Sequence, residues 1–259
     1  MKLLQTLQAG QGDNAEGLGP RADVVTLPGL GTNWQVEYNC GRNPQPSRPL
    51  HASMALFFSF DGIDGVGKST QLRLFCQWLE DEGREVVVCR DPGSTPLGER
   101  IREILLKSDK SLSIGSRSEM LLYMAARAQL VESVIRPALT AGKTVVSDRY
   151  LLANVVYQGH AGGLDVQSVR QVGGIAVDRL MPDCTFLLDM DPATALARMG
   201  RQLDRVESRG AAYREQLRAG FLEEAAKGGS THVIRAERTI EAVQAEIRNI
   251  AAALLSQSS

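Results

Sequence analysis

Short apolar runs alternate with stretches of helical periodicity from residue 54 to the end of the chain. Each run is short enough to be a single buried strand, and ten or more residues separate it from the next. Strands joined by helices of this length form parallel sheets with helices on both faces. The pattern therefore predicts an α/β fold with a five-stranded parallel sheet, its strands at residues 56–60, 85–89, 144–147, 185–189 and 231–234.

The last helical stretch shows the clearest periodicity. Its apolar residues recur at helical spacing, and we interpret that face as ordinary core packing. The residues are Ile240, Val243, Ile247, Ile250 and Leu254.

Residues 1–53 differ in kind from the rest of the chain. They are rich in Gly, Asn, Pro and Gln and show no sustained period of either strand or helix. One interpretation is a misassigned start, with Met54 as the true first residue. The other is a genuine disordered or regulatory extension. In both cases we expect residues 54–259 to form one domain.

Charge and cysteine content narrow the functional classes. A net charge of −1 and an isoelectric point near 6.3 give no global reason to expect nucleic-acid or membrane binding. No apolar run approaches the length of a membrane span, and the first residues lack a secretory signal. The cysteines (Cys40, Cys76, Cys89 and Cys184) have no C-x-x-C spacing, so we expect reduced thiols and a cytoplasmic setting.

The first predicted strand leads directly into a phosphate-binding loop. Gly62, Gly67, Lys68 and Ser69 follow the spacing G-x-x-x-x-G-K-S, and a helix begins directly after them. The glycines let backbone N–H groups turn toward phosphate oxygens, the lysine can reach the β and γ phosphates, and the serine hydroxyl can bind Mg²⁺. We expect ATP to bind along the whole segment, Gly62, Ile63, Asp64, Gly65, Val66, Gly67, Lys68, Ser69 and Thr70.

Charged clusters also follow the next two predicted strands. Arg90 opens the segment 90–95, and Asp148 and Arg149 follow the third strand. Ligands of open parallel sheets bind beyond the carboxyl ends of the strands, so these side chains are candidates for chemistry. An aspartate there suits control of Mg²⁺, and an arginine suits a phosphate because its fork bonds two oxygens. Taken alone, Asp148 and Arg149 are more typical of an exposed or intra-loop ion pair, but the phosphate loop on a neighbouring strand favours the functional interpretation.

A third basic cluster lies at residues 198–205. Arg198, Arg201 and Arg205 follow the fourth strand and a short helix, and a segment of about residues 198–210 could close over a triphosphate. An arginine supplied to the transition state of phosphoryl transfer is worth about 10³ to 10⁵ in rate. The alternative is a solvated basic surface.

From residue 54 onward the chain resembles the thymidylate kinase family, P-loop enzymes that transfer the γ-phosphate of ATP to dTMP. The resemblance implies a three-layer P-loop fold with a mobile lid, ATP as phosphate donor, Mg²⁺, and a homodimer formed through helices on the face away from the nucleotides. It is carried by five segments, Phe60-Asp-Gly-Ile-Asp-Gly-Val-Gly-Lys-Ser-Thr70, Arg90-Asp-Pro-Gly-Ser-Thr-Pro-Leu-Gly-Glu99, Leu121-Leu-Tyr-Met-Ala-Ala-Arg127, Asp148-Arg-Tyr through Tyr157-Gln-Gly159, and Leu203-Asp-Arg-Val-Glu207.

The resemblance also implies roles at the sugar and the phosphates. Asp64 would contact the acceptor's 3′-hydroxyl and the metal-bound phosphates, while Arg90 and Arg149 would hold the acceptor phosphate. Tyr157 would lie beside C2′ of the sugar and disfavour a ribose hydroxyl. Ser69 and Asp148 would serve the metal.

For the base, the resemblance implies stacking and edge contacts. Tyr123 would stack on thymine, and Arg127 and Asn154 would hydrogen-bond the base edge. Gln158 belongs to the same substrate-binding segment. Taken without the resemblance, Tyr123 and Arg127 are typical of helix packing plus a solvated charge.

The family supplies its transition-state arginine from the phosphate loop or from the lid. Position 65 is glycine here, so the resemblance assigns that role to the lid, with Arg201 first and Arg198 and Arg205 as alternatives. Other departures from the family pattern are Asp91, Ser94, Ala153 and Arg235, of which the last puts the adenine contacts in doubt.

Three other functions remain open from the sequence. A deoxynucleoside kinase of related fold would prefer thymidine over dTMP, although the Arg90 and Arg149 pair favours a monophosphate. A P-loop switch GTPase is disfavoured because the chain has no N-K-x-D segment. A catalytically inactive relative is disfavoured because the loop lysine, the loop serine and the arginines are present.

Overall fold

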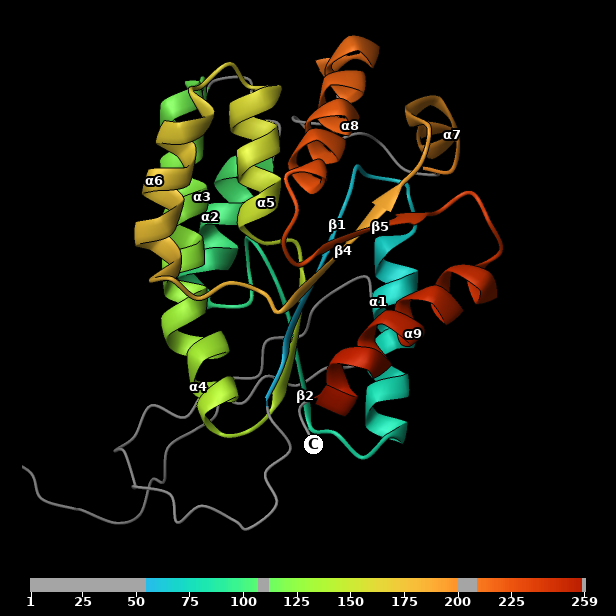
Figure 1. The fold of residues 1–259 in the computed structure, drawn as a ribbon. Coiled ribbons are helices and arrows are strands. Elements are labelled where there is room, and N and C mark those ends of the chain that lie inside the picture. The colour runs from blue at the N-terminus through green and yellow to red at the C-terminus, as the bar shows by residue number, and fades with distance from the viewer. Residues whose placement is uncertain (1–54, 107–111, 200–208, 258–259) are drawn as a thin grey trace, which may run out of the picture.

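The computed structural model describes residues 55–106, 112–199 and 209–257. Its centre is a parallel sheet of five strands in the order β2-β3-β1-β4-β5 (Figure 1). All the strands predicted from sequence are present, with ends shifted by at most a residue. They are β1 (Phe57–Asp61), β2 (Val86–Arg90), β3 (Thr144–Asp148), β4 (Cys184–Asp189) and β5 (Thr231–Arg235).

Alternate residues of β1 face two separate cores. Phe58 and Phe60 pack with Phe75 and Phe186 on one face, whereas Phe57 packs against Tyr150 on the other. The first core is covered by α1 (Lys68–Asp81), α8 (Ala211–Ala226) and α9 (Ile240–Gln257). The second is covered by α3 (Ser116–Leu130), α4 (Arg136–Thr140) and α6 (Val166–Val177). This is the predicted three-layer arrangement.

The shorter helices lie near the carboxyl edge of the sheet or on its outer layer. They are α2 (Pro96–Leu106), α5 (Leu151–Asn154) and α7 (Pro192–Ala197). Two π-helical turns, Val131–Ile135 and Val155–His160, continue α3 and α5 without a break. Such turns are rare and recur at functional sites.

The predicted apolar face of the last helix is largely confirmed. Val243 and Ile247 are buried, and Ile250 and Leu254 pack against the same core. Ile240 is 49% exposed because it is the first residue of α9, where its carbonyl accepts a hydrogen bond from the buried Gln71.

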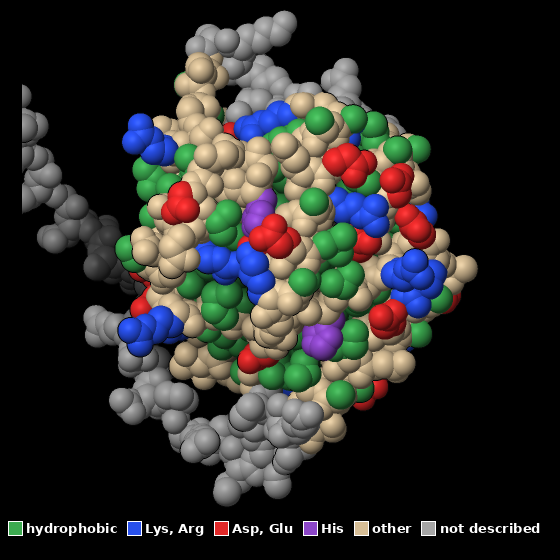
Figure 2. Space-filling model, turned by 45° about the horizontal axis from the view of Figure 1, so that its top comes forward, with side chains coloured by type: hydrophobic (Ala, Val, Ile, Leu, Met, Phe, Trp, Pro, Cys, Tyr) green, Lys and Arg blue, Asp and Glu red, His purple; other side chains and the backbone are tan. Residues whose placement is uncertain are grey.

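The surface carries charges of both signs. Figure 2 shows basic and acidic side chains intermixed over the face in view. Among the described residues, the helices fall short of the length and apolar character that crossing a membrane requires. The predictions for residues 1–53 lie outside the described ranges.

Candidate active site

The phosphate loop joins β1 to α1 and turns its backbone toward solvent. Ile63 and Val66 point into the core, which leaves backbone groups to line the loop. At Gly62 an added Cβ would lie 2.4 Å from the Leu188 carbonyl oxygen, and at Gly65 it would lie 2.1 Å from that of Ala195. Both glycines also have positive φ angles, 131° and 88°. The loop can therefore pass this close to its neighbours only with glycine at these positions.

Lys68 is buried and folded back onto the loop. Its Nζ donates to the carbonyl oxygens of Gly62 at 3.0 Å and Ile63 at 2.8 Å, and to Asp64 Oδ1 at 3.3 Å. Burial and the neighbouring Arg149 lower the pKa of Lys68. All three ammonium hydrogens have partners within the loop, so any further acceptor at Nζ would have to displace one of them.

Arg149 meets the loop from the end of β3. It donates to Asp64 Oδ1 at 2.5 Å and to the Gly62 carbonyl at 3.1 Å, and its guanidinium lies 5.1 Å from the centre of the Tyr157 ring. The Tyr157 hydroxyl donates to Asp64 Oδ2 at 3.4 Å. Burial would raise the pKa of Asp64, but Arg149 and Lys68 hold it well below its usual range.

The backbone of Arg149 is itself unusual. Its φ is 69°, in the left-handed region that non-glycine residues rarely adopt. Strain of this kind persists where the surroundings impose it, commonly at functional sites. The conformation aims the Arg149 side chain across the sheet at the phosphate loop.

Two further arginines lie near the phosphate loop, Arg90 at the end of β2 and Arg102 on α2. Arg90 donates from NH2 to Glu99 Oε2 at 2.7 Å, while its buried Nε has no hydrogen-bond partner among the described residues. Arg102 donates to the Pro92 carbonyl at 2.9 Å and lines the same cavity. The sequence analysis missed Arg102. The sequence pattern that could have found it is the spacing of three between Glu99 and Arg102. On a helix this spacing places both side chains on one face, and on α2 that face is turned toward Arg90.

These side chains surround one cavity of about 470 Å³. Arg198, from the end of α7, also lines it and donates to the Ala236 carbonyl at 3.3 Å. Arg201 and Arg205 lie outside the described residues. The lining comprises Asp64, Gly65, Gly67, Lys68, Ser69, Thr70, Arg90, Asp91, Arg102, Asp148, Arg149, Arg198 and Met199.

Two carboxylates near the phosphate loop have oxygen atoms that accept no hydrogen bond from the described residues: Asp148, which lines the cavity together with Ser69, and Asp61, which precedes Gly62 in the chain. Asp148 Oδ1 and both carboxylate oxygens of the fully buried Asp61 lack hydrogen-bond partners in the described part of the chain. Burial raises the pKa of Asp61 to about 7, although Arg149 and Lys68 oppose the shift. Hard oxygen atoms of this kind are the ligands that Mg²⁺ prefers, directly or through water, so the donor set fits that ion.

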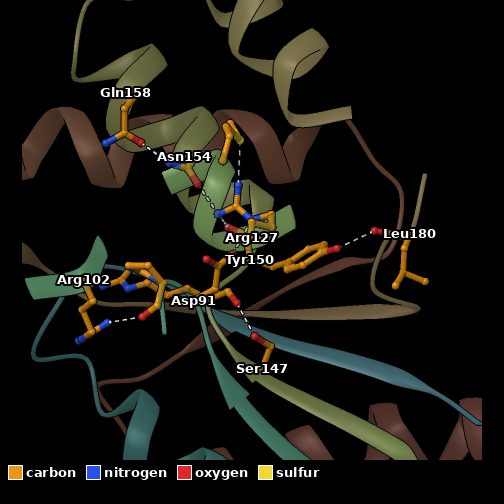
Figure 3. A network of polar contacts seen from close by, with 11 residues as sticks. Asp91, Arg102, Arg127, Ser147, Tyr150, Asn154, Gln158 and Leu180 are labelled. Atoms are coloured by element: carbon orange, nitrogen blue, oxygen red, sulfur yellow. Dashed lines mark hydrogen bonds and ion pairs between the residues drawn. The ribbon is translucent and has the colours of Figure 1, made fainter. Parts of the chain in front are cut away.

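Arg127 occupies the far end of the site and is completely buried (Figure 3). Its Nε donates to Asp91 and its NH2 donates to Asn154 Oδ1 and, at 3.3 Å, to the Tyr150 carbonyl. Among the residues that the structure describes, its NH1 meets only a weak acceptor, Met124 Sδ, at 3.2 Å. Arg127 is therefore a buried side chain anchored by hydrogen bonds and not the solvated charge that the helix spacing alone would suggest.

Asn154 and Gln158 extend this network. Asn154 Nδ2 donates to Gln158 Oε1 at 2.6 Å, and Gln158 Nε2 donates to Glu119 Oε1 at 3.0 Å. Tyr123 is partly buried one helical turn before Arg127, packed against Ile101 and Leu105 of the outer helical layer.

Comparisons with known proteins match this arrangement. The thymidylate kinase family model matches residues 60–247. A thymidylate kinase of Rhodopirellula baltica is 44% identical over 88% of this chain and 90% of its own length, and one of Symbiobacterium thermophilum is 42% identical over 76% and 92%. The crystal structure of thymidylate kinase from Ehrlichia chaffeensis superposes with a TM-score of 0.62 at 30% identity, covering 76% of this chain and 98% of that one.

Proposed function

Because this chain belongs to the thymidylate kinase family and is an enzyme that phosphorylates dTMP with ATP, we propose that the two nucleotides meet in the cavity at the carboxyl edge of the sheet. The observation that carries this proposal is that Lys68 and Arg149, from different strand ends, both bond Asp64 Oδ1. Cations from separate strands thus converge on one point. The triphosphate of ATP and the phosphate of dTMP are both anionic, so bringing them together needs this concentration of positive charge.

On the donor side, the loop backbone and Lys68 hold the triphosphate. Lys68 exchanges its bonds to the Gly62 and Ile63 carbonyls for phosphate oxygens, which costs little because the number of hydrogen bonds is kept. Ser69 and Asp148 would hold Mg²⁺, which would supply neutralising charge to the donor phosphates.

On the acceptor side, Arg90, Arg102 and Arg149 hold the monophosphate. The unpartnered Nε of Arg90 is a donor ready for one of its oxygens. The acceptor phosphate is already largely ionised near neutral pH, since its second pKa is about 6, so no protein base is required. Catalysis then rests on alignment and on charge neutralisation.

Sugar and base are recognised beyond the phosphates. Asp64 receives the 3′-hydroxyl, and the Tyr157 ring, held between Arg149 and Phe221, leaves little room for a 2′-hydroxyl. Tyr123 stacks on thymine, and Arg127 and Asn154 hydrogen-bond its edge.

Arg198, Arg201 and Arg205 are the candidates for the arginine that acts on the transferring phosphoryl group. Gly65 cannot be replaced by that arginine in this backbone, because a Cβ there meets Ala195.

We also propose that the enzyme is a cytoplasmic homodimer. Helices α2, α3 and α6 lie in one outer layer, in which α3 packs against both α2 and α6 (Figure 1). These helices carry large exposed apolar side chains. These are Leu97, Ile104, Leu121 and Ile175, which are 47%, 44%, 53% and 82% exposed. Exposed apolar groups gathered on one layer mark an association surface.

The cytoplasmic setting is supported by the cysteines. The free thiols of Cys76, Cys89 and Cys184 suit a reducing compartment.

The test is a substrate comparison with the purified full chain, ATP and Mg²⁺. ADP release is measured with dTMP, with thymidine and with the other nucleoside monophosphates. We expect dTMP to give the highest kcat/KM. A preference for thymidine would refute the acceptor site that we assign to Arg90, Arg102 and Arg149.

A further inference from the structure

The π-helical turn Val155–His160 passes over the backbone carbonyl of Tyr157. In an α-helix the N–H of Ala161 would donate to that carbonyl, four residues earlier in the chain. Here it donates to the carbonyl of Val156 at 3.0 Å, five residues earlier. A carbonyl that loses its helical donor in this way needs another one.

Tyr213 of α8 supplies that donor. Its hydroxyl donates to the Tyr157 carbonyl at 3.3 Å and accepts a hydrogen bond from NH1 of Arg209 at 3.1 Å. A guanidinium has only donors, so the hydroxyl proton of Tyr213 is directed away from Arg209 and toward Tyr157. The bond therefore ties α8 to the backbone of the tyrosine that we place beside the sugar.

Gly220, two turns further along α8, lets the helix approach the π-helical turn closely. A Cβ added at Gly220 would lie 2.8 Å from His160 Cβ and 3.2 Å from Val156 Cγ1. The packing has no room for that atom, so it would push the helix and the turn apart. His160 and Val156 stand on either side of Tyr157 in the chain, and Phe221 of α8 packs edge-on against the Tyr157 ring, 6.1 Å between ring centres.

We propose that Tyr213 and Gly220 are positioning residues, through which α8 holds the π-helical turn so that Tyr157 closes the acceptor site against a ribose 2′-hydroxyl. The inference rests on the proposed placement of Tyr157 beside the sugar. Both residues act through Tyr157, whose own hydroxyl donates to Asp64 Oδ2. The sequence analysis singled out neither of them.

The exclusion of one hydroxyl group depends on small distances. A misplacement of about 1 Å can change the rate of an enzyme by about 100-fold. The Tyr157 ring lies between the guanidinium of Arg149 and the ring of Phe221, and Phe221 belongs to α8. Separation of α8 from the turn would therefore release one side of the Tyr157 ring and open space beside C2′.

The test uses dTMP and ribothymidine 5′-monophosphate, which differ only in the 2′-hydroxyl. Tyr213→Phe removes the donor to the Tyr157 carbonyl, and Gly220→Ala adds the methyl group that the interface cannot hold. We expect the ratio of kcat/KM for dTMP over the ribonucleotide to fall about fivefold in Tyr213→Phe and about tenfold or more in Gly220→Ala. KM for ATP should stay unchanged in both.

Each variant has a matched control. Ser230→Ala removes a hydroxyl that also donates to a backbone carbonyl, that of Pro182 at 3.1 Å, but at the amino end of the sheet. Gly174→Ala adds a methyl group to a glycine of α6, where it would meet none of the described residues within 4 Å. We expect both controls to keep the wild-type ratio.

The outcomes separate the two proposals. If wild type prefers dTMP over the ribonucleotide and both Tyr213→Phe and Gly220→Ala keep that preference, the positioning role is wrong and the proposed function stands. A ratio that falls equally in the controls would overturn the role as well. If Gly220→Ala does not fold, Tyr213→Phe decides alone. If wild type accepts both nucleotides equally, the proposed role of Tyr157 and this inference fail together, whereas phosphoryl transfer to dTMP stands.

Discussion

Arg149 donates a hydrogen bond of 2.5 Å to Asp64, a residue 85 positions earlier in the chain. The contact links the end of β3 to the phosphate loop at the end of β1. It also gives the guanidinium of Arg149 an ionic partner from another strand end. Because Lys68 shares the same oxygen, binding of substrate exchanges one set of charge-assisted bonds for another and does not expose bare charges.

Asp64→Asn should remove the common anchor of Arg149 and Lys68 with little change of shape. We expect kcat/KM for dTMP to fall by about 100-fold or more, since the orientation of both cations is lost. The melting temperature at neutral pH should also fall, because the lowered pKa of Asp64 means that its ion pairs with Arg149 and Lys68 stabilise the folded state above that pKa. Steady-state kinetics together with a thermal melt check this, and activity at the wild-type level would remove Asp64 from the mechanism.

Lys68→Ala should abolish phosphoryl transfer while the fold survives. The three hydrogen bonds of Nζ all go to the loop itself, so the core keeps its packing. We expect kcat to fall by about 10³ or more through lost stabilisation of the transferring phosphoryl group. Circular dichroism controls for folding. Measurable turnover within tenfold of wild type would contradict the assignment.

Asp61→Asn should change how stability depends on pH. The pKa of Asp61 is raised from 3.8 to about 7 by burial, so between those values the folded state holds a proton that the unfolded state has lost. Its contribution to stability is therefore present at low pH and is lost as pH rises through 7. Relative to wild type, Asp61→Asn should gain about 3 kcal/mol between pH 5 and pH 8.

Urea unfolding of both proteins across that range measures the difference. A difference in unfolding free energy that does not vary with pH would show that Asp61 titrates normally.

Asp91→Ala should destabilise the fold strongly. Arg127 and Asp91 are 1% and 0% exposed, and removal of one partner leaves a buried charge uncompensated, at a cost of about 3 to 5 kcal/mol. The exposed pair of Lys143 and Glu85 is the control, since its side chains are 42% and 77% exposed. Glu85→Ala should cost less than about 1 kcal/mol in the same chemical unfolding assay. Equal costs would contradict the argument.

Ile175→Asp should weaken the proposed dimer. Ile175 is 82% exposed on α6, so a charge there costs nothing in the folded monomer but opposes burial against a second copy. Light scattering after size-exclusion chromatography should show a monomer for the variant and a dimer for wild type. An unchanged dimer would place the interface elsewhere, and a monomeric wild type would refute the dimer.

Local patterns predicted most of the fold and the position of the phosphate loop. The strands and the flanking helices follow from apolar periodicity, and the phosphate loop follows from glycines and Lys68 at set spacing. Both depend on residues adjacent in sequence, so packing elsewhere does not alter them. The roles carried by family resemblance, including those of Arg201 and Arg205, stay predictions.

The remaining site features were decided by tertiary packing. Glu119 and Gln158 meet across 39 positions only because α3 packs against a π-helical turn, and a period of 3.6 does not predict where such a turn directs its side chains. In the sequence alone, Arg102 cannot be told from an ordinary surface arginine. Only the packed structure shows that α2 places it in the same cavity lining as Arg90. The sequence by itself determined which groups could bind phosphate. The packed structure decided which of them share a cavity and in which direction their hydrogen bonds run, since those depend on distances between elements far apart in the chain.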